Sequence, residues 1–325
     1  MIIMNKGNVV RWVIVGIMLV FIATMISSPA LAETPVLSMD FTQGGTVPKA
    51  DGWTYDDSGN EIGYTDSTIE MTLERGNLTL TVKGKKVKHE TVVIRVKIQD
   101  VSQLRTAVSK DTYKGRGQAK GLDMAKSKNA VVAMNGDFFK YEYDVGYVVR
   151  QGEFIRDATA NKRKRIFDML LIDSKGNFHT IDQADTKKIE AYVSDALETE
   201  GLSILDTFNL GPVLIKDGEV QDISQSEVAR EGLYQWKYPQ QRICIAQTGE
   251  LEYAIVEVFG RTDSSAGISL QDFAEFVHEQ VPDAITAYNL DGGGSTNLVV
   301  NNKRACSTPG LREITDIIYF ASAEE

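Results

Sequence analysis

The stretch Tyr288-Asn289-Leu290-Asp291-Gly292-Gly293-Gly294-Ser295-Thr296 lies between two apolar segments, 284–288 and 298–300, which we interpret as buried strands. Three consecutive glycines leave the backbone without side chains that would keep a ligand away. A carboxylate followed by bare N–H groups suits a small, oxygen-rich and partly anionic ligand. A tight turn needs only one glycine, so we interpret the stretch as a binding site. It is neither a P-loop nor a dinucleotide-binding fingerprint, because neither Gly-Lys-Ser/Thr nor a helical pattern follows the glycines.

Short apolar segments and turn signals dominate the rest of the chain. Strands are predicted at 78–82, 91–96, 130–134, 147–149, 154–155, 166–172, 213–215, 242–246, 251–259 and 314–320. Hairpin turns are predicted at 151–152, 174–177, 216–218 and 247–250. Helical spacing occurs at 121–128 and 270–281, the latter capped by Ser269. Many strands and few helices predict an α+β fold, with a mixed central β-sheet, flanking helices and several β-hairpins.

One internal similarity connects the glycine stretch with a second segment. Residues 130–137 align without gaps on residues 284–291, and each copy ends in Asn-x-Asp after an apolar strand. We predict that the two strands are neighbours in one sheet and present Asp137 and Asp291 to one cleft. Asn135 and Asn289 would brace the two loops through side-chain-to-backbone hydrogen bonds. Chance similarity between buried strands is the alternative.

The N-terminus predicts export. Lys6 and Arg11 precede an apolar segment, 12–26, and Ala30-Leu31-Ala32 then provides a cleavage site. We predict a signal peptide at 1–32, a partly β N-terminal extension at 33–89 and the main domain at 90–325. An uncleaved N-terminal anchor is the alternative, since the apolar segment approaches the length of a membrane span. With no later span expected, the mature protein would be secreted or extracytoplasmic, in the cell envelope.

Charge and residue usage exclude several function classes. The formal net charge of the 325 residues is -10, which argues against a nucleic-acid partner. Cys244 and Cys306 can pair in an exported protein, but they form neither a disulfide framework nor a zinc motif. The three histidines lie outside every Gly- or Asp-rich loop. Catalysis is therefore expected to depend on carboxylates and arginines.

With these motifs identified, the chain resembles the phosphodiester glycosidase family over roughly residues 90–322. The resemblance rests on Asn135-Gly136-Asp137-Phe138-Phe139, Gly211-Pro212 with Asp217-Gly218, Arg242, Gly260-Arg261 with Gly267, Asn289 through Thr296, and Arg312. It implies hydrolysis of a sugar-1-phosphodiester, resembling a GlcNAc-1-phosphodiester, at the anomeric carbon. The substrate would be a carbohydrate phosphodiester, from a cell-wall glycan or an exopolysaccharide.

The resemblance also implies roles for individual residues. A phosphate monoester is a good leaving group, so cations that neutralise it matter more than a strong general acid. Arg242, Arg261 and Arg312 are candidates because a guanidinium binds phosphate oxygens bidentately. Asp291, and after it Asp137, would stabilise the oxocarbenium-like centre, attack it or activate water. The remaining candidate substrate-binding residues are Asn135, Gly136, Asn289, Gly292, Gly293, Gly294, Ser295 and Thr296, the N–H groups of 292–295 holding phosphate or sugar oxygens.

Two other function classes fit the same residues. A metal-dependent phosphodiesterase would use Asp137 and Asp291 to hold Ca²⁺ or Mg²⁺, and it would cleave the P–O bond. A non-catalytic envelope glycan-binding protein would hold sugar in the same cleft without turnover. Within the glycosidase interpretation the sequence requires no cofactor, although Ca²⁺ or Mg²⁺ can support such a site.

Overall fold

The computed structural model describes residues 36–82, 85–112, 117–136, 146–157, 159, 167–209, 211–233, 235–262, 265–305 and 311–325. The predicted signal peptide, Asp137 and Cys306 lie outside these residues. Thr34–Glu325 form one structural unit. None of the helices in the described part of the chain has the length and hydropathy needed to cross a bilayer.

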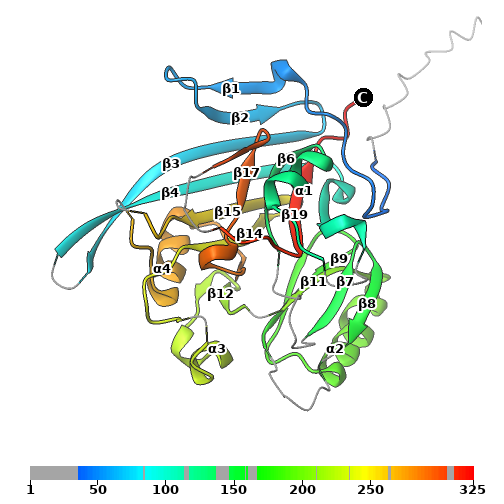
Figure 1. Cartoon of the computed structure of the whole chain (residues 1–325). Coiled ribbons are helices and arrows are strands. Elements are labelled where there is room, and N and C mark those ends of the chain that lie inside the picture. The colour runs from blue at the N-terminus through cyan, green and yellow to red at the C-terminus, as the bar shows by residue number, and fades with distance from the viewer. Residues whose placement is uncertain are drawn as a thin grey trace, which may run out of the picture. The chain divides into compact units, whose positions relative to one another are not determined.

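The largest element of the fold is a nine-stranded sheet in the order β1-β2-β3-β4-β15-β14-β16-β12-β13. Its strands are β1 (Trp53–Tyr55), β2 (Glu61–Thr65), β3 (Ile69–Val82), β4 (Lys85–Ile98), β12 (Val213–Lys216), β13 (Glu219–Val220), β14 (Arg242–Gly249), β15 (Glu252–Val258) and β16 (Thr286–Asn289). The long β3–β4 hairpin runs below β1 and β2 in Figure 1. Because β4 crosses the boundary predicted between residues 89 and 90, the N-terminal extension and the main domain share this sheet.

Three smaller sheets complete the β-structure. A five-stranded sheet has the order β18-β17-β6-β19-β5, a three-stranded sheet the order β10-β9-β11, and β7 pairs with β8. Their strands are β5 (Leu104–Val108), β6 (Ala130–Asn135), β7 (Tyr147–Arg150), β8 (Glu153–Asp157), β9 (Met169–Asp173), β10 (Phe178–Ile181), β11 (Ile204–Asn209), β17 (Leu298–Val300), β18 (Lys303–Arg304) and β19 (Asp316–Ala321).

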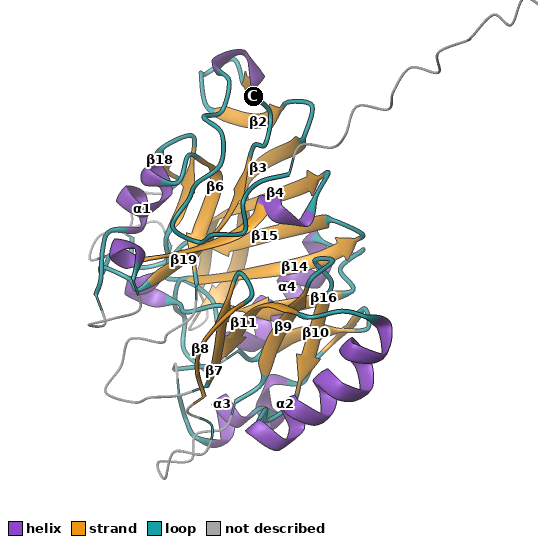
Figure 2. Ribbon diagram, turned by 90° about the vertical axis from the view of Figure 1, so that its right-hand side faces the viewer, coloured by secondary structure: helices purple, strands orange, loops and turns teal. Residues whose placement is uncertain are grey.

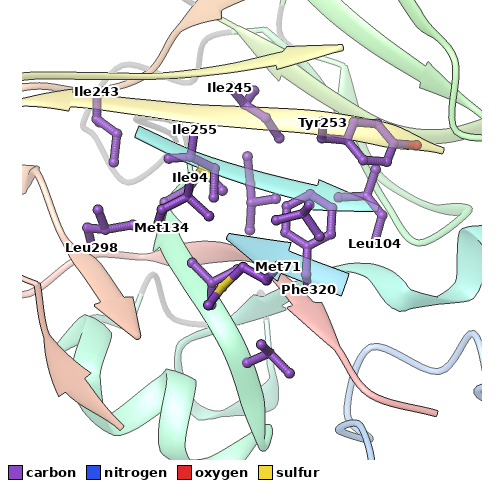
Figure 3. Packing of buried hydrophobic residues seen from close by; sticks show 14 of the residues in the cluster. Met71, Ile94, Leu104, Met134, Ile243, Ile245, Tyr253, Ile255, Leu298 and Phe320 are labelled. Carbon is purple, nitrogen blue, oxygen red and sulfur yellow. The ribbon is translucent and has the colours of Figure 1, made fainter. Parts of the chain in front are cut away.

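The main hydrophobic core lies between the nine-stranded and five-stranded sheets. Ile94, Ile245 and Ile255 extend from the first sheet towards Met134 and Phe320 of the second (Figure 3). The strand β14 explains why both faces of the large sheet are apolar. Successive side chains point to opposite faces, so alternate residues of its apolar sequence enter this core while the others enter a second core on the outer face.

Four short α-helices of the described residues pack against parts of these sheets. They are α1 (Gly121–Ser127), α2 (Thr186–Tyr192), α3 (Glu227–Arg230) and α4 (Leu270–Gln280). The helix α4 packs on the nine-stranded sheet, α1 on the five-stranded sheet, and α2 beside β9 and β10 (Figure 2). Shorter 3₁₀ or π segments are η1 (Ala50–Gly52), η2 (Val101–Gln103), η3 (Ser109–Asp111), η4 (Val193–Leu197), η5 (Glu198–Glu200), η6 (Ile223–Gln225) and η7 (Gly293–Ser295).

Local predictions agree with the structure better than the predicted sheet arrangement does. The four predicted hairpins form as β7–β8, β9–β10, β12–β13 and β14–β15, and Ser269 caps α4 by accepting from the N–H of Asp272. The protein is mainly β and α+β in the broad sense. In place of one mixed central sheet there are several sheets, and every pairing between the described strands is antiparallel.

The internal similarity does not reflect neighbouring strands, so that prediction was wrong. The strand β6 belongs to the five-stranded sheet and β16 to the nine-stranded sheet. Both strands are buried on two sides, and this shared environment is enough to select similar apolar residues. A short apolar pattern cannot specify which sheet a strand joins.

Cys244 lies in β14 with its thiol buried in the core beneath α4. Burial raises the pKa of this thiol well above its usual range. The sequence leaves open whether Cys244 and Cys306 pair, and Cys306 lies outside the described residues.

Candidate active site

The glycine stretch connects the two packed sheets. β16 ends at Asn289 in the nine-stranded sheet, the chain forms the turn η7, and β17 begins at Leu298 in the five-stranded sheet. In that second sheet β17 pairs with β6, which ends at Asn135. The two Asn-containing strand ends therefore meet at one edge of the sandwich, although the strands belong to different sheets.

Buried asparagines hold this connection in place. Asn135 donates from Nδ2 to the carbonyl of Asp291 at 2.8 Å, and its Oδ1 accepts from the N–H of Asn297 at 3.0 Å. Asn289 donates from Nδ2 to the carbonyl of Gly211 at 2.8 Å, where the Gly211–Pro212 peptide is cis. The predicted bracing by Asn135 and Asn289 is confirmed, and Asn135 joins the two loops directly.

A cavity of about 220 Å³ opens at the glycine stretch. Its lining brings together Gln235, Gln240, Arg242, Arg261, Asp291, Gly292, Gly293 and Arg312. The three predicted arginines come from β14, from the loop after β15 and from the segment before β19, yet all three reach the same space. The structure therefore places these arginines around Asp291.

Arg242 is the most firmly held of the three arginines. Its guanidinium is buried and donates to the backbone carbonyls of Gln235 at 3.2 Å, Tyr238 at 3.3 Å and Ile268 at 3.3 Å. Burial lowers the pKa of Arg242 to about 10, while the negative charge of Asp291 acts in the opposite direction. Arg242 consequently remains protonated at neutral pH and places a fixed positive charge beside Asp291.

The other two arginines are exposed and lie against the glycine stretch. Arg261 adopts a left-handed backbone conformation with φ 59° and donates from a terminal nitrogen to Oε1 of Gln240 at 3.1 Å. Arg312 donates from its side chain to Oγ of Ser295 at 2.8 Å, and from its backbone to the carbonyl of Gly294 at 2.6 Å. A ligand in the cavity would meet both guanidiniums.

Glycine is required at two positions, by the surrounding backbone at Gly292 and by the backbone conformation at Gly293. A Cβ on Gly292 would stand 2.8 Å from the carbonyl oxygen of Gln241. Gly293 has φ 61°, and a Cβ there would stand 2.8 Å from a terminal nitrogen of Arg261. The backbone here is thus packed between Gln241, which directly precedes β14, and the guanidinium of Arg261.

Several backbone N–H groups of the glycine stretch are already hydrogen-bonded within the protein. The N–H of Gly293 donates to Gln241 at 2.9 Å, and those of Ser295 and Thr296 donate to carbonyls of the 3₁₀ turn. Of the N–H groups predicted to bind ligand, those of Gly293 and Ser295 are therefore already occupied. Two buried oxygens, Oδ1 of Asn289 and Oγ1 of Thr296, have no hydrogen-bond partner within the described structure.

Gly136 lies directly above a buried ion pair. A Cβ on this glycine would stand 2.5 Å from the carboxyl group of Asp316. That carboxyl accepts from Nε of Arg150 at 3.1 Å and from a terminal nitrogen of Arg150 at 2.8 Å, and both side chains are almost completely buried. The pair supports the end of β6, where the chain leads to Asp137 outside the described residues.

The described residues do not provide the cluster of metal ligands that a metal-dependent phosphodiesterase would need. Within them no group of three or more His, Cys, Asp or Glu side chains is arranged to hold a cation. The carboxylate in the cavity, Asp291, is surrounded by guanidiniums, which oppose the binding of a further positive charge. The position of Asp137 relative to this set lies outside the described residues.

Comparison with known proteins agrees with this geometry. The sequence profile of the phosphodiester glycosidase family matches residues 128–321, which include every candidate site residue. The chain belongs to the phosphodiester glycosidase family. A search of curated protein sequences gave no match.

Among solved structures, one shows a similar fold and another gives a weaker match. The catalytic domain of zebrafish N-acetylglucosamine-1-phosphodiester alpha-N-acetylglucosaminidase, auto-inhibited by its pro-peptide, has a TM-score of 0.60 at 16% identity, over 83% of this chain and 87% of that chain. A hypothetical protein from Synechocystis has a TM-score of 0.49 at 17% identity, over 78% of this chain and 62% of that chain.

Sequence reasoning missed several residues of the candidate site in this phosphodiester glycosidase family member. Gln235 and Gln240 line the cavity, and Asn297 connects Asn135 to the glycine loop. The pair Gln240-Gln241 immediately before Arg242 was an available signal, as was Asn297 directly after Thr296. The buried pair Arg150–Asp316 gave no sequence signal, because its partners lie far apart in the chain.

Proposed function

We propose that this phosphodiester glycosidase is an exported enzyme that hydrolyses a sugar-1-phosphodiester at the anomeric C–O bond. The observation that supports this most is the convergence of Arg242, Arg261 and Arg312 on Asp291 in one cavity. A carbohydrate phosphodiester combines an anion with a sugar ring, and it needs cations and a carboxylate within a short distance of each other. The name of the zebrafish relative suggests GlcNAc-1-phosphodiester as the first substrate to try.

The arginines would act on the leaving group. As the C–O bond breaks, negative charge grows on the departing phosphate, and guanidiniums held in place stabilise that charge without reorganising. Arg242 suits this role best, because three backbone carbonyls fix its position and burial limits screening by solvent. Arg261 and Arg312, at the exposed rim, would capture the phosphate as it enters.

Asp291 would act on the sugar. Its half-buried carboxylate lies on the cavity wall, and its backbone carbonyl is fixed by Asn135. In this position it stabilises positive charge at the anomeric carbon, attacks that carbon or activates water. Asp137 is proposed as the second carboxylate, Gly292 and Gly294 as backbone donors, and Asn289, Ser295 and Thr296 as polar contacts to substrate.

The proposed organisation keeps the N-terminal assignments. Residues 1–32 would be the signal peptide, which places the enzyme in the extracytoplasmic space or leaves it anchored there if it is not cleaved. Residues 33–89 would be an extension whose strands β1 to β3 enlarge the main sheet. A phosphodiester within a cell-wall glycan or an exopolysaccharide would be accessible in that compartment.

Hydrolysis assays on residues 33–325 test the proposal. Wild type, Asp291→Asn and Arg242→Lys would be incubated with a GlcNAc-1-phosphodiester and with a panel of other sugar-1-phosphodiesters, each with and without EDTA. We expect free sugar and phosphate monoester from wild type with or without chelator, and losses of about 100-fold or more in both variants. Activity that EDTA abolishes would favour the metal-dependent phosphodiesterase. Binding without turnover across the panel would favour the glycan-binding protein.

A further inference from the structure

A chain of side-chain amides runs from Arg261 along the cavity wall. Arg261 donates to Oε1 of Gln240 at 3.1 Å, and Gln240 donates from Nε2 to Oε1 of Gln235 at 2.7 Å. All three residues line the cavity that contains Asp291. The residues at the two ends of this hydrogen-bonded series have left-handed backbones, with φ 59° at Arg261 and φ 47° at Gln235. Such conformations are uncommon outside glycine and concentrate at functional sites.

The direction of this chain is fixed by chemistry. A guanidinium can only donate hydrogen bonds, so the oxygen of the Gln240 amide must face Arg261 and its NH₂ group must face away. The Gln235 amide then receives that NH₂ group with its oxygen. The NH₂ group of Gln235 is left at the end of the chain as a donor, with no acceptor among the described residues.

The backbone of Gln235 is held as well as its side chain. Its carbonyl accepts from Arg242 at 3.2 Å and from the N–H of Tyr238 at 2.8 Å. Gln235 is thus held by Arg242 through its main chain and connected to Arg261 through its amide. A residue held from both sides presents its NH₂ group at a defined position even though it is exposed.

Most of the side chains that line this cavity carry hydrogen-bond donors. Arg242, Arg261, Arg312 and Gln235 line the space, together with the single carboxylate of Asp291. A group that binds this wall must bring several acceptor oxygens and negative charge. The oxygens of a phosphate group meet that requirement, whereas an ammonium or a second amide donor does not.

We propose that Gln235 is a specificity-determining residue that donates its amide N–H to a phosphoryl oxygen, with Gln240 as the positioning residue that orients it from Arg261. The location of the phosphate within the proposed reaction rests on the proposed function. The affinity of the cavity for a phosphate group does not depend on the proposed function, and this affinity can be measured without turnover.

Binding of inorganic phosphate to residues 33–325 by calorimetry tests the proposal. Gln235→Glu keeps the oxygen that accepts from Gln240 and replaces the terminal donor with a negatively charged oxygen. We expect phosphate affinity to fall about tenfold or more, because one charge-assisted hydrogen bond is lost and a repulsion is introduced. Gln225→Glu is the matched control, since it makes the same change at an exposed glutamine that lines a different cavity.

A second variant separates position from charge. Gln240→Met removes the link between Arg261 and Gln235 without adding charge, and it should weaken phosphate binding by a smaller factor than Gln235→Glu. For a substrate that the enzyme turns over, Gln235→Glu should raise KM at least as much as it lowers kcat, since the contact already exists in the bound substrate.

The results distinguish the two proposals. If wild type binds phosphate and only the Gln235 and Gln240 variants bind it more weakly, the amide chain recognises phosphate, whether or not a sugar-1-phosphodiester is hydrolysed. A second outcome is that wild type hydrolyses a sugar-1-phosphodiester while Gln235→Glu, like Gln225→Glu, keeps the wild-type phosphate affinity and KM. In that case the inference about Gln235 is wrong and the proposed function stands. Wild-type protein that does not bind phosphate would also overturn the inference.

Discussion

Glu257 should make the stability of this protein depend on pH. Its side chain is completely buried in β15, where Oε1 accepts from Nε2 of Gln241 at 2.7 Å. Burial raises the pKa of this carboxyl to about 8, and the hydrogen bond from Gln241 acts in the opposite direction. The backbone of Gln241 accepts from Gly293, so Glu257 also lies next to a support of the glycine loop.

The sign follows from the protons bound in each state. Between pH 4.5 and about 8 the folded protein keeps the Glu257 proton and the unfolded chain has lost it. Folding therefore takes up a proton, and the free energy of unfolding falls as pH rises, by about 1.4 kcal/mol per unit. From pH 5 to pH 8 the contribution approaches about 4 kcal/mol. Above the folded pKa it no longer changes.

The perturbation is Glu257→Gln, which preserves shape and an acceptor for Gln241 but cannot titrate. Urea unfolding of both proteins from pH 5 to pH 8 should show E257Q gaining stability relative to wild type as pH increases. Glu250→Gln, at an exposed turn of the same β14–β15 hairpin, is the control and should follow wild type. Parallel stability curves for wild type and E257Q would refute the reasoning, because they would mean that Glu257 titrates alike in both states.

Three further predictions concern residues that support the site. Arg150→Met leaves the buried carboxyl of Asp316 without this guanidinium. It should lower the free energy of unfolding, measured by urea titration, by about 3–5 kcal/mol. A loss smaller than about 1 kcal/mol would mean that the carboxyl takes up a proton instead. Gly293→Ala and Gly152→Ala both place alanine at positive φ, and each should cost about 1 kcal/mol of stability. Only Gly293→Ala should also lower kcat/KM, because its Cβ meets Arg261. Nothing lies within 4 Å of a Cβ at Gly152, so Gly152→Ala is the control. Equal losses of activity in the two variants would contradict this expectation. Asn135→Asp keeps the acceptor for Asn297 but loses the donor to the carbonyl of Asp291, so about 1–3 kcal/mol of stability and part of kcat should be lost. A variant with unchanged thermal unfolding and kinetics would show that this bond does not position the loop.

Local sequence signals predicted local structure well. Gln151-Gly152 and Asp217-Gly218 determine hairpins through residues that tolerate positive φ, and Ser269 determines a helix start. These signals act between neighbours in the chain, so one sequence suffices to detect them.

The arrangement of the sheets depends on contacts that no short pattern contains. Residues 130–135 and 284–289 have similar sequences but join different sheets, because their pairing depends on β19 and β14, which come later or earlier in the chain. Asp316 and Arg150 meet in the core across a separation of 166 residues. The buried Glu257 gave no sequence signal either, because alternating strand residues usually place a glutamate on the solvent side.

The sequence could single out residues of the candidate site, whose roles remain a proposal. Asp291 and the glycine stretch stood out because a carboxylate beside three glycines has few structural explanations. The arginines followed from family resemblance, and the structure places all three at one cavity. Gln235 gave no sequence signal, and Gln240, although it stands near Arg242 in the sequence, becomes informative only when its hydrogen-bond partners are known.

The central claim is that the enzyme cleaves the bond between the anomeric carbon and oxygen, with Asp291 acting on the sugar. Hydrolysis of a sugar-1-phosphodiester in ¹⁸O-labelled water, followed by mass spectrometry of both products, tests it most directly. The account predicts label on the sugar, none on the phosphate monoester, and loss of the labelled sugar in Asp291→Asn. Label on the phosphate would contradict it, because P–O cleavage would then be the reaction of this site.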